Sequence, residues 1–278
     1  MTTDTIANYP TIELNDGRSI PQLGFGTYQI EADGDAESAV RKAVDIGYRL
    51  VDTAAIYRNE KGVGAGLKDH DDIWLTTKVW NESQGYDRTL KAFGKCLDRL
   101  GRDSVDCVLI HWPCPGNDKY VETWKAFIEI QKAGKAKSIG VSNFLEPHLK
   151  RIVDETGVAP VLNQIELHPS FQQKEARKVH EAMGIATQSW SPLGQGDAMD
   201  NDVVNGLAEK LGRTPAQVVL RWHIDNGLLV IPKASSEEHM RDNFGVLDFE
   251  LSPEDLAAFD ALDSEDGRMG PDPATMNS

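Results

Sequence analysis

Apolar and polar residues are arranged along the chain in blocks that predict strands followed by helices. Short apolar runs rich in Val, Ile and Leu and bounded by Gly, Pro or Asp are typical of buried strands. Eight such runs follow one another, at residues 24–28, 48–52, 72–78, 105–111, 137–142, 161–167, 185–190 and 228–233. Because strands that alternate with helices form a parallel sheet with the helices outside it, the pattern predicts an α/β fold.

The segments between these runs have the 3.6-residue spacing of amphipathic helices. In residues 35–46 the apolar positions 39, 40, 43 and 44 share one face, and Gly47 is a typical helix end. Thr214 and Pro215 are typical of a helix cap and first turn. Residues 252–255 begin another helix with a capping-box pattern.

The number of strand–helix units favours a closed barrel over an open sheet. Asn15-Asp16-Gly17 predicts a β-hairpin near the N-terminus. An open sheet would place a dinucleotide on a G-x-G-x-x-G loop, but the glycines of residues 62–66 have the wrong spacing and lie in a helical segment. The sequence therefore predicts a (β/α)8 TIM barrel with an N-terminal β-hairpin and extra helices near the C-terminus, and no linker divides residues 1–278 into more than one domain.

Composition restricts the partners. The net charge of −15 and the pI of about 4.9 argue against nucleic acid or an anionic membrane as partner. Residues 1–10 lack the basic and apolar regions of an export signal, and no apolar run approaches the ~20 residues that span a bilayer. Cys96, Cys107 and Cys114 have no C-x-x-C spacing, so free thiols in a reducing cytoplasm are expected.

Ionisable residues stand where the predicted strands end. Asp52, Lys78 and His111 close three consecutive runs, and Tyr57 follows the first of them. Taken singly, each is more often a helix cap, a solvated charge or a packed histidine. Because the C-terminal ends of the strands carry the active site in such barrels, their joint placement indicates a catalytic site.

These four residue types favour proton transfer to an oxygen. A lysine beside an aspartate stays charged, and a nearby cation lowers the pKa of a tyrosine from about 10, which makes it a general acid. A neutral His111 could orient the substrate oxygen. His111 and Cys114 are too few ligands for a metal site, so no metal is expected. His168 and His223 are interpreted as structural.

Several segments together resemble the aldo-keto reductase family over essentially the full chain. In order, they are GFGTY, GYRLVDTAAIYRNE, LTTKVWN, VLIHWP, GKAKSIGVSNF, NQIELHP, QSWSPLGQG and VIPKAS. The run HWPCPGNDKYVETW and the short C-terminal tail resemble the bacterial branch that includes 2,5-diketo-D-gluconic acid reductases.

The resemblance implies roles for individual positions. Asp52, Tyr57, Lys78 and His111 match the catalytic tetrad, with Tyr57 as proton donor. The cofactor-binding positions are Ser142, Asn143, Gln164, Trp190, Ser191, Leu193, Gln195, Lys233, Ser235, His239, Asp242 and Asn243. The substrate-binding positions are Phe25, Trp80, His111 and Trp112. The family also implies a monomer and NADPH as cofactor.

Two departures from the family pattern concern the cofactor. Ala234 stands where a serine is common, and His239 where an arginine commonly faces the adenine and the 2′-phosphate. A mostly neutral histidine cannot reproduce the charged fork of arginine. We therefore expect NADPH to be preferred, with NADH tolerated. Lys61, where the family often has Glu, is expected to affect only the surface.

The expected function is NAD(P)H-dependent reduction of aldehydes, α-dicarbonyls or keto-sugars and keto-acids to alcohols. One alternative is a cofactor-sensing regulatory subunit with little turnover. Another is an unrelated barrel that uses Lys78 to form a Schiff base. The aromatic pocket residues and the short tail suggest an open site with loose specificity.

Overall fold

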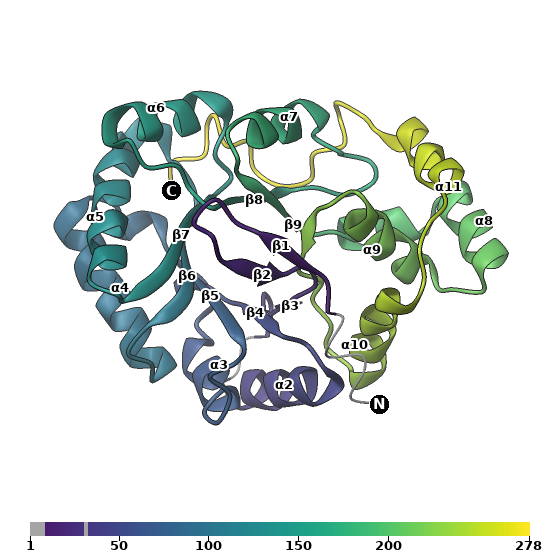
Figure 1. Ribbon diagram of the computed structural model, residues 1–278, viewed down its shortest axis with the longest axis horizontal. Helices are drawn as coiled ribbons and strands as arrows, with labels where there is room; N and C mark the ends of the chain where they lie inside the picture. Colours follow the sequence, from purple (N-terminus) through teal and green to yellow (C-terminus); the bar gives the residue numbers. More distant parts are fainter. Residues whose placement is uncertain (1–8, 31–32) are drawn as a thin grey trace.

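An eight-stranded parallel sheet forms the centre of the computed structural model, which describes residues 9–30 and 33–278 (Figure 1). Each strand is hydrogen-bonded to the next one in the chain, so the spatial order follows the sequence. The strands are β3 Phe25–Gly26, β4 Leu50–Asp52, β5 Trp74–Val79, β6 Val105–Ile110, β7 Ala136–Ser142, β8 Leu162–Glu166, β9 Ala186–Trp190 and β10 Leu229–Val230. The predicted order of strands is confirmed.

Backbone hydrogen bonds between the first and last strands close the sheet into a barrel. The amide of Gly24 donates to the carbonyl oxygen of Val230 at 2.8 Å, and that of Gly26 to Pro232 at 3.1 Å. Both closing strands are shorter than the predicted runs. Pro232 has no amide hydrogen to continue the ladder, and Gly26 approaches the Ile231 backbone so closely that a Cβ would lie 2.8 Å from its oxygen. The (β/α)8 barrel is confirmed.

Helices surround the barrel, and the main apolar core fills the space between them and the strands (Figure 1). They are α2 Asp33–Ile46, α3 Glu60–Gly66, α4 Tyr86–Leu100, α5 Tyr120–Lys132, α6 Glu146–Thr156, α7 Lys174–Ala182, α8 Asp202–Leu211, α9 Pro215–Asp225, α10 Glu237–Phe244 and α11 Pro253–Ala258. The extra helices expected near the C-terminus are α8 and α11. The predicted helix caps are confirmed. Thr214 Oγ1 accepts a hydrogen bond from the Gln217 amide at 3.2 Å, and Ser252 Oγ accepts one from the Asp255 amide at 3.1 Å.

The predicted hairpin covers the N-terminal end of the barrel. It consists of the antiparallel strands β1 Thr11–Glu13 and β2 Ser19–Pro21 and crosses the centre of the ring in Figure 1. Ile20 is fully buried in a cluster with Leu50 and Leu229, which begin barrel strands. Asn15 Nδ2 donates to the carbonyl oxygen of Pro160 at 2.9 Å. The hairpin therefore seals one end of the barrel.

The glycine-rich run at residues 62–66 serves helix packing, as predicted. It forms most of α3, which lies between α2 and α4. A Cβ on Gly62 would overlap the carbonyl oxygen of Asp33, and one on Gly64 would overlap that of Leu100. The missing side chains thus allow the three helix backbones to approach closely.

The remaining sequence-based expectations concern compartment and domain organisation. The three cysteines are buried and unpaired, as expected. In the described part of the chain, no helix is both long and apolar enough to cross a membrane. Most of residues 1–10, from which the absence of an export signal was inferred, lies outside the described residues. The single domain at 1–278 stays a prediction.

We expect Gly64→Ala to destabilise the fold by about 1–3 kcal/mol, because its methyl group would force α3 away from α4. Gly94→Ala is the matched control, since an added Cβ in this interior position of α4 meets no atom within 4 Å. The free energy of unfolding of the control should rise by up to about 1 kcal/mol, because alanine has a higher helix propensity than glycine. Urea denaturation of both variants measures the difference, and equal stabilities would contradict the close packing at Gly64.

Candidate active site

Three neighbouring strands end in ionisable side chains at the same end of the barrel. β4 ends at Asp52, β5 carries Lys78 one residue before its end, and His111 follows β6 directly. Tyr57 closes the 3-10 helix η1, Ala55–Tyr57, in the loop after β4. Active sites of such barrels lie at this end of the strands. The structure thus brings the four residues of the predicted tetrad together.

Lys78 and Asp52 form a buried ion pair. The Lys78 side chain is fully buried, that of Asp52 is 2% exposed, and Lys78 Nζ donates to the carboxylate. Lys78 Nζ also donates to the Thr53 carbonyl oxygen at 3.0 Å. The second carboxylate oxygen accepts from Gln164 Nε2 at 2.9 Å. Because a buried charge without partners is costly, these extra bonds are what allow the pair to be buried.

The tyrosine lies directly against this pair. Lys78 Nζ is 5.1 Å from the centre of the Tyr57 ring. Tyr57 is partly exposed at the rim. Burial of the phenol raises its pKa by more than the Lys78 charge lowers it, so the pKa of Tyr57 lies above 10.0. The expectation of a lowered tyrosine pKa is therefore wrong in its net direction. Tyr57 stays protonated at neutral pH.

Lys78 keeps its charge despite its position. Burial lowers the pKa of Lys78, but the Asp52 carboxylate and Tyr57 raise it by more, so the net pKa lies above its ordinary value. The ammonium group is therefore a permanent positive charge beneath the tyrosine.

His111 is a neutral imidazole between two aromatic rings. Its ring stands edge-on to Tyr57, with centroids 5.8 Å apart, and to Trp80, with centroids 5.0 Å apart. Burial, reinforced by the Lys78 charge, lowers the pKa of His111 well below 6.5. Among the described residues, its buried Nδ1 has no hydrogen-bond partner. Since an unsatisfied buried polar atom is costly, a ligand atom at this place would be favoured.

Amide and hydroxyl side chains line the ends of the next strands. Asn143 Nδ2 donates to the His111 carbonyl oxygen at 3.0 Å, and Asn143 Oδ1 accepts from Trp190 Nε1 at 2.8 Å. Ser142 Oγ donates to the Gln164 carbonyl oxygen at 2.8 Å. The four side chains expected to contact a nicotinamide therefore lie together beside His111, and the Asn143 contact fixes the Trp190 ring.

The loop after β9 has an unusual backbone. It contains the expected cofactor-binding residues Ser191, Leu193 and Gln195 and continues into the 3-10 helix η4, Gly194–Met199. Ser191 has φ +49° and Gln195 φ +53°, which are unfavourable for residues with side chains. Such conformations cluster at ligand-binding sites.

The remaining cofactor candidates follow β10 and lie on α10. Lys233, Ser235 and His239 are exposed, Asp242 is partly buried, and Asn243 is buried. A bridge between Lys233 and Gly26 places the start of this segment beside β3. Because α10 begins at this end of the barrel, these side chains form a second group, which follows the last strand.

Phe25 does not fit the substrate role expected for it. The side chain is fully buried and packs edge-on against Tyr48 at 5.8 Å, within the core between barrel and helices. Three residues further on, Tyr28 is 57% exposed, and its ring centre lies 5.1 Å from that of Tyr57. Tyr28 was not among the predicted site residues, although it belongs to the same GFGTY segment.

The two tryptophans have different surroundings. Trp80 follows β5 and is partly exposed beside His111. Trp112 is 7% exposed, and its carbonyl oxygen accepts from the buried Gln84 Nε2 at 2.6 Å. Gln84, which the sequence analysis did not single out, thus holds the loop that carries His111 and Trp112.

The C-terminal tail is hydrogen-bonded to the end of β8 and to the loop after β5. The Glu166 carboxylate accepts the amides of Met269 at 2.6 Å and Gly270 at 3.0 Å. Asn81 Nδ2 donates to the Ser278 carbonyl oxygen at 2.6 Å. In Figure 1 the tail, in yellow, runs from α11 past α7 toward α6. The tail is therefore held against this end of the barrel, and the expectation of an open site with loose specificity stays a prediction. Glu166 ends β8, and its position near the end of a predicted strand was the only sequence signal for its contact with the tail.

The other histidines of interest are structural, as predicted. His168 is fully buried and contacts Glu166 Oε1 at 3.3 Å and Ser170 Oγ at 3.0 Å. His223 is fully buried in α9, with Nε2 3.1 Å from the Pro192 carbonyl oxygen. Across residues 9–30 and 33–278, no three His, Cys, Asp or Glu side chains cluster as metal ligands.

Comparison with known proteins gives one consistent result. The Aldo/keto reductase family model matches residues 22–264. An aldo-keto reductase of Mycolicibacterium smegmatis is 51% identical over 272 residues, 96% of this chain and 98% of the relative. Methylglyoxal reductase DkgA of Escherichia coli is 46% identical over 274 residues, again 96% and 98% of the two chains.

A solved structure agrees with this result. The crystal structure of a Gox0644 mutant in complex with NADPH is 50% identical, covers 96% of this chain and 98% of its own, and has a TM-score of 0.95. A family match over most of the chain, together with relatives that span nearly all of it, leaves one conclusion. The chain belongs to the aldo-keto reductase family and is an oxidoreductase.

Proposed function

We propose that this enzyme reduces small aldehydes, α-dicarbonyls and related keto compounds to alcohols, with Tyr57 as the proton donor. The observation that carries the proposal is the buried Asp52–Lys78 pair beneath Tyr57, with neutral His111 at its edge. The similarity to a methylglyoxal reductase supports the α-dicarbonyl substrate. The intact tetrad favours turnover over a purely cofactor-sensing role.

The enzyme uses NADP(H), the cofactor of aldo-keto reductases. When bound, the reduced nicotinamide supplies the hydride that reaches the carbonyl carbon. The amide-rich cluster suits a carboxamide, since it offers both donors and acceptors. We assign the carboxamide to Ser142, Asn143 and Gln164, the ring to Trp190, the pyrophosphate to residues 191–195, and the adenosine and 2′-phosphate to Lys233, Ser235, His239, Asp242 and Asn243.

Tyr57 gives its proton to the carbonyl oxygen as that oxygen gains negative charge. The phenolate that remains is stabilised by Lys78, 5.1 Å from the ring centre, and Asp52 keeps Lys78 charged. His111 holds the carbonyl oxygen through a ring nitrogen, which orients it toward Tyr57. These residues place a proton donor and a fixed positive charge where charge develops.

Aromatic side chains form the walls of the substrate site in this proposal. Tyr28 and Trp80 lie against Tyr57 and His111, respectively, and Trp112 follows His111 in the chain. Flat rings of this kind suit small, planar dicarbonyl groups. We further propose that the enzyme is a cytoplasmic monomer; the three buried thiols are compatible with a reducing compartment.

We expect Tyr57→Phe to lower kcat about 10²–10⁴-fold while leaving NADPH affinity nearly unchanged, because only the transferable proton is lost. Tyr86→Phe, at an exposed tyrosine that begins α4, is the control and should keep the wild-type rate. Methylglyoxal-dependent NADPH oxidation and fluorescence titration with NADPH measure the two quantities. A Tyr57→Phe variant with wild-type kcat would rule out the proton-donor role.

The pH profile of reduction should be flat across neutral pH. The active form of Tyr57 is protonated, and since its pKa lies above 10.0, the rate should fall only as pH rises toward that value. His111 stays neutral because its pKa is well below 6.5, so it should cause no loss at slightly acidic pH. The measurement is kcat/KM for methylglyoxal as a function of pH. A fall in kcat/KM with a midpoint below about pH 9 would contradict a raised pKa of Tyr57.

We expect His239→Arg to raise the preference for NADPH over NADH by at least about tenfold, or 1.4 kcal/mol, because arginine adds a permanent charge for the 2′-phosphate. His70→Arg, in the loop before β5 and therefore at the other end of the barrel, should leave the preference unchanged. The ratio of kcat/KM for the two cofactors reports the effect. A wild-type preference above about a thousandfold, roughly 4 kcal/mol, would show that His239 does not weaken discrimination.

A further inference from the structure

A strongly basic hollow lies beside the active site, and of the residues assigned to substrate and cofactor only Trp80 lines it. Its volume is about 640 Å³, and it lies between η1 and α4. Five cationic side chains line it, namely Arg58, Arg88, Lys91, Lys95 and Arg99. We call it the basic hollow. Its volume lies within the range of small-molecule binding clefts, about 300–1,000 Å³.

The charges of the basic hollow are unusual for this chain. The protein has 44 acidic and 29 basic residues, so most cations have acidic neighbours available. Glu82 is the one acidic side chain that lines the hollow, and Arg99 is paired with Glu60 Oε2 at 2.5 Å. Within residues 9–30 and 33–278, Arg58, Arg88, Lys91 and Lys95 have no ion-pair partner. The hollow therefore has several uncompensated positive charges.

Most of these charges lie along one helix, where each has a like-charged neighbour one turn away. Arg88, Lys91, Lys95 and Arg99 are spaced three or four residues apart, so they lie on one face of α4. Like charges one turn apart destabilise a helix. Arg88 is also in the first turn, where the helix dipole disfavours a cation. A bound anion would relieve both effects.

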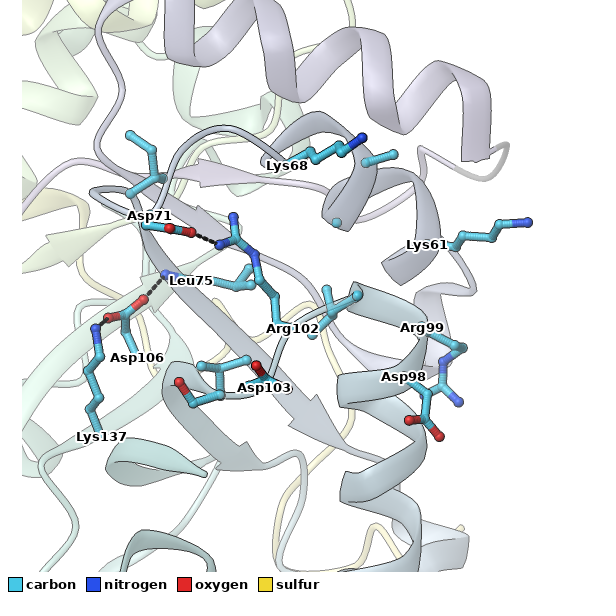
Figure 2. A pocket seen from close by; sticks show the side chains of 17 residues that line it. Lys61, Lys68, Asp71, Leu75, Asp98, Arg99, Arg102, Asp103, Asp106 and Lys137 are labelled. Carbon is cyan, nitrogen blue, oxygen red and sulfur yellow. Dashed lines mark hydrogen bonds and ion pairs between the residues drawn. The ribbon is translucent and has the colours of Figure 1, made fainter. Parts of the chain in front are cut away.

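A second hollow, at the other end of β5, has more carboxylates than the basic hollow. Figure 2 shows this cavity of about 780 Å³, which lies near the starts of β5 and β6. There Arg102 pairs with Asp71, and Lys137 pairs with Asp106 at 2.8 Å. Asp106 also accepts the Leu75 amide at 2.8 Å. Four carboxylates accompany five cationic side chains in this second hollow, whereas one carboxylate accompanies five cationic side chains in the basic hollow.

We propose that the basic hollow binds a small anion with two or more negative charges, such as an organic phosphate or a polycarboxylate. Arginine forks and lysine ammonium groups are the side chains that bind these groups. A polyanionic macromolecule would be repelled by the rest of the surface, since the net charge is −15. A small anion reaches the five cations without meeting that surface.

The basic hollow adjoins the catalytic residues through one side chain. Trp80 lines the hollow, and its ring is edge-on to His111 at 5.0 Å. Arg58 directly follows the proposed proton donor Tyr57. The binding of the anion does not depend on the proposed reaction, because none of the five cations belongs to the tetrad.

The test is calorimetric titration of the full-length protein, saturated with NADPH so that the cofactor site is filled. The probes are inorganic pyrophosphate for the phosphate class, citrate for the polycarboxylate class, and acetate as the single-charge comparison. The variant is Arg88→Gln/Lys91→Gln/Lys95→Gln, which leaves Arg58 beside the active site intact. These three side chains are exposed and glutamine is a good helix former, so the fold is preserved.

The matched control removes three charges elsewhere, as Lys42→Gln/Lys119→Gln/Lys135→Gln, all at exposed lysines. We expect one equivalent of pyrophosphate or citrate to bind the wild type and the control, more weakly as salt increases, with acetate at least about tenfold weaker. The triple variant in α4 should lose at least about tenfold in affinity for the probe. NADPH affinity, measured in parallel, should be equal in all three proteins.

The outcomes separate the possibilities. Binding of pyrophosphate alone assigns a phosphate ligand, and binding of citrate alone a polycarboxylate. Equal affinity in the wild type and the α4 variant, or no binding of either probe at low salt, overturns the proposal. Loss of NADPH affinity in the α4 variant would also overturn it, since the hollow would then belong to the cofactor site.

Discussion

Lys78 holds its positive charge in a part of the barrel from which solvent is excluded, and the arrangement of the active site depends on how that charge is balanced. Asp52 supplies the opposite charge, and Thr53 and Gln164 complete the hydrogen bonds of the pair. Removing one partner of a buried pair typically costs about 3–5 kcal/mol, because the other charge is left unpaired. The Asp52–Lys78 pair and its hydrogen bond to Gln164 therefore connect the ends of β4, β5 and β8. Tyr57 and His111 are positioned around this pair.

The barrel could be predicted from the sequence because its signals are local. Each strand is a short apolar run, and caps such as Thr214 and Ser252 mark helix starts through their own side-chain bonds. The tetrad could be predicted for the same reason, since Asp52, Lys78 and His111 stand at strand ends. The predicted strands were too long where the barrel closes, because the contact of Gly26 with the distant Pro232 segment cannot be read from either segment alone.

Other features depend on three-dimensional surroundings. The family resemblance assigned Phe25 to the substrate site, but a match of residue types does not show which way a side chain faces. Phe25 is buried in the core, and Tyr28 was missed. The direction of the Tyr57 pKa depends on the balance between burial and the Lys78 charge, which residue types alone do not give. The tail has no periodic pattern, and its position follows from single hydrogen bonds to Glu166 and Asn81.

The hairpin at the N-terminal end has a consequence for the traffic of ligands. With Ile20 fully buried across that end, the carboxyl ends of the strands, where Asp52 and Lys78 lie, are the end of the barrel left for ligands to approach. The amide cluster assigned to the nicotinamide lies among buried residues, whereas Tyr28 at the rim is largely exposed. In the proposed function the nicotinamide would therefore lie deeper than the substrate, so we expect the cofactor to bind before the substrate and to leave after the product.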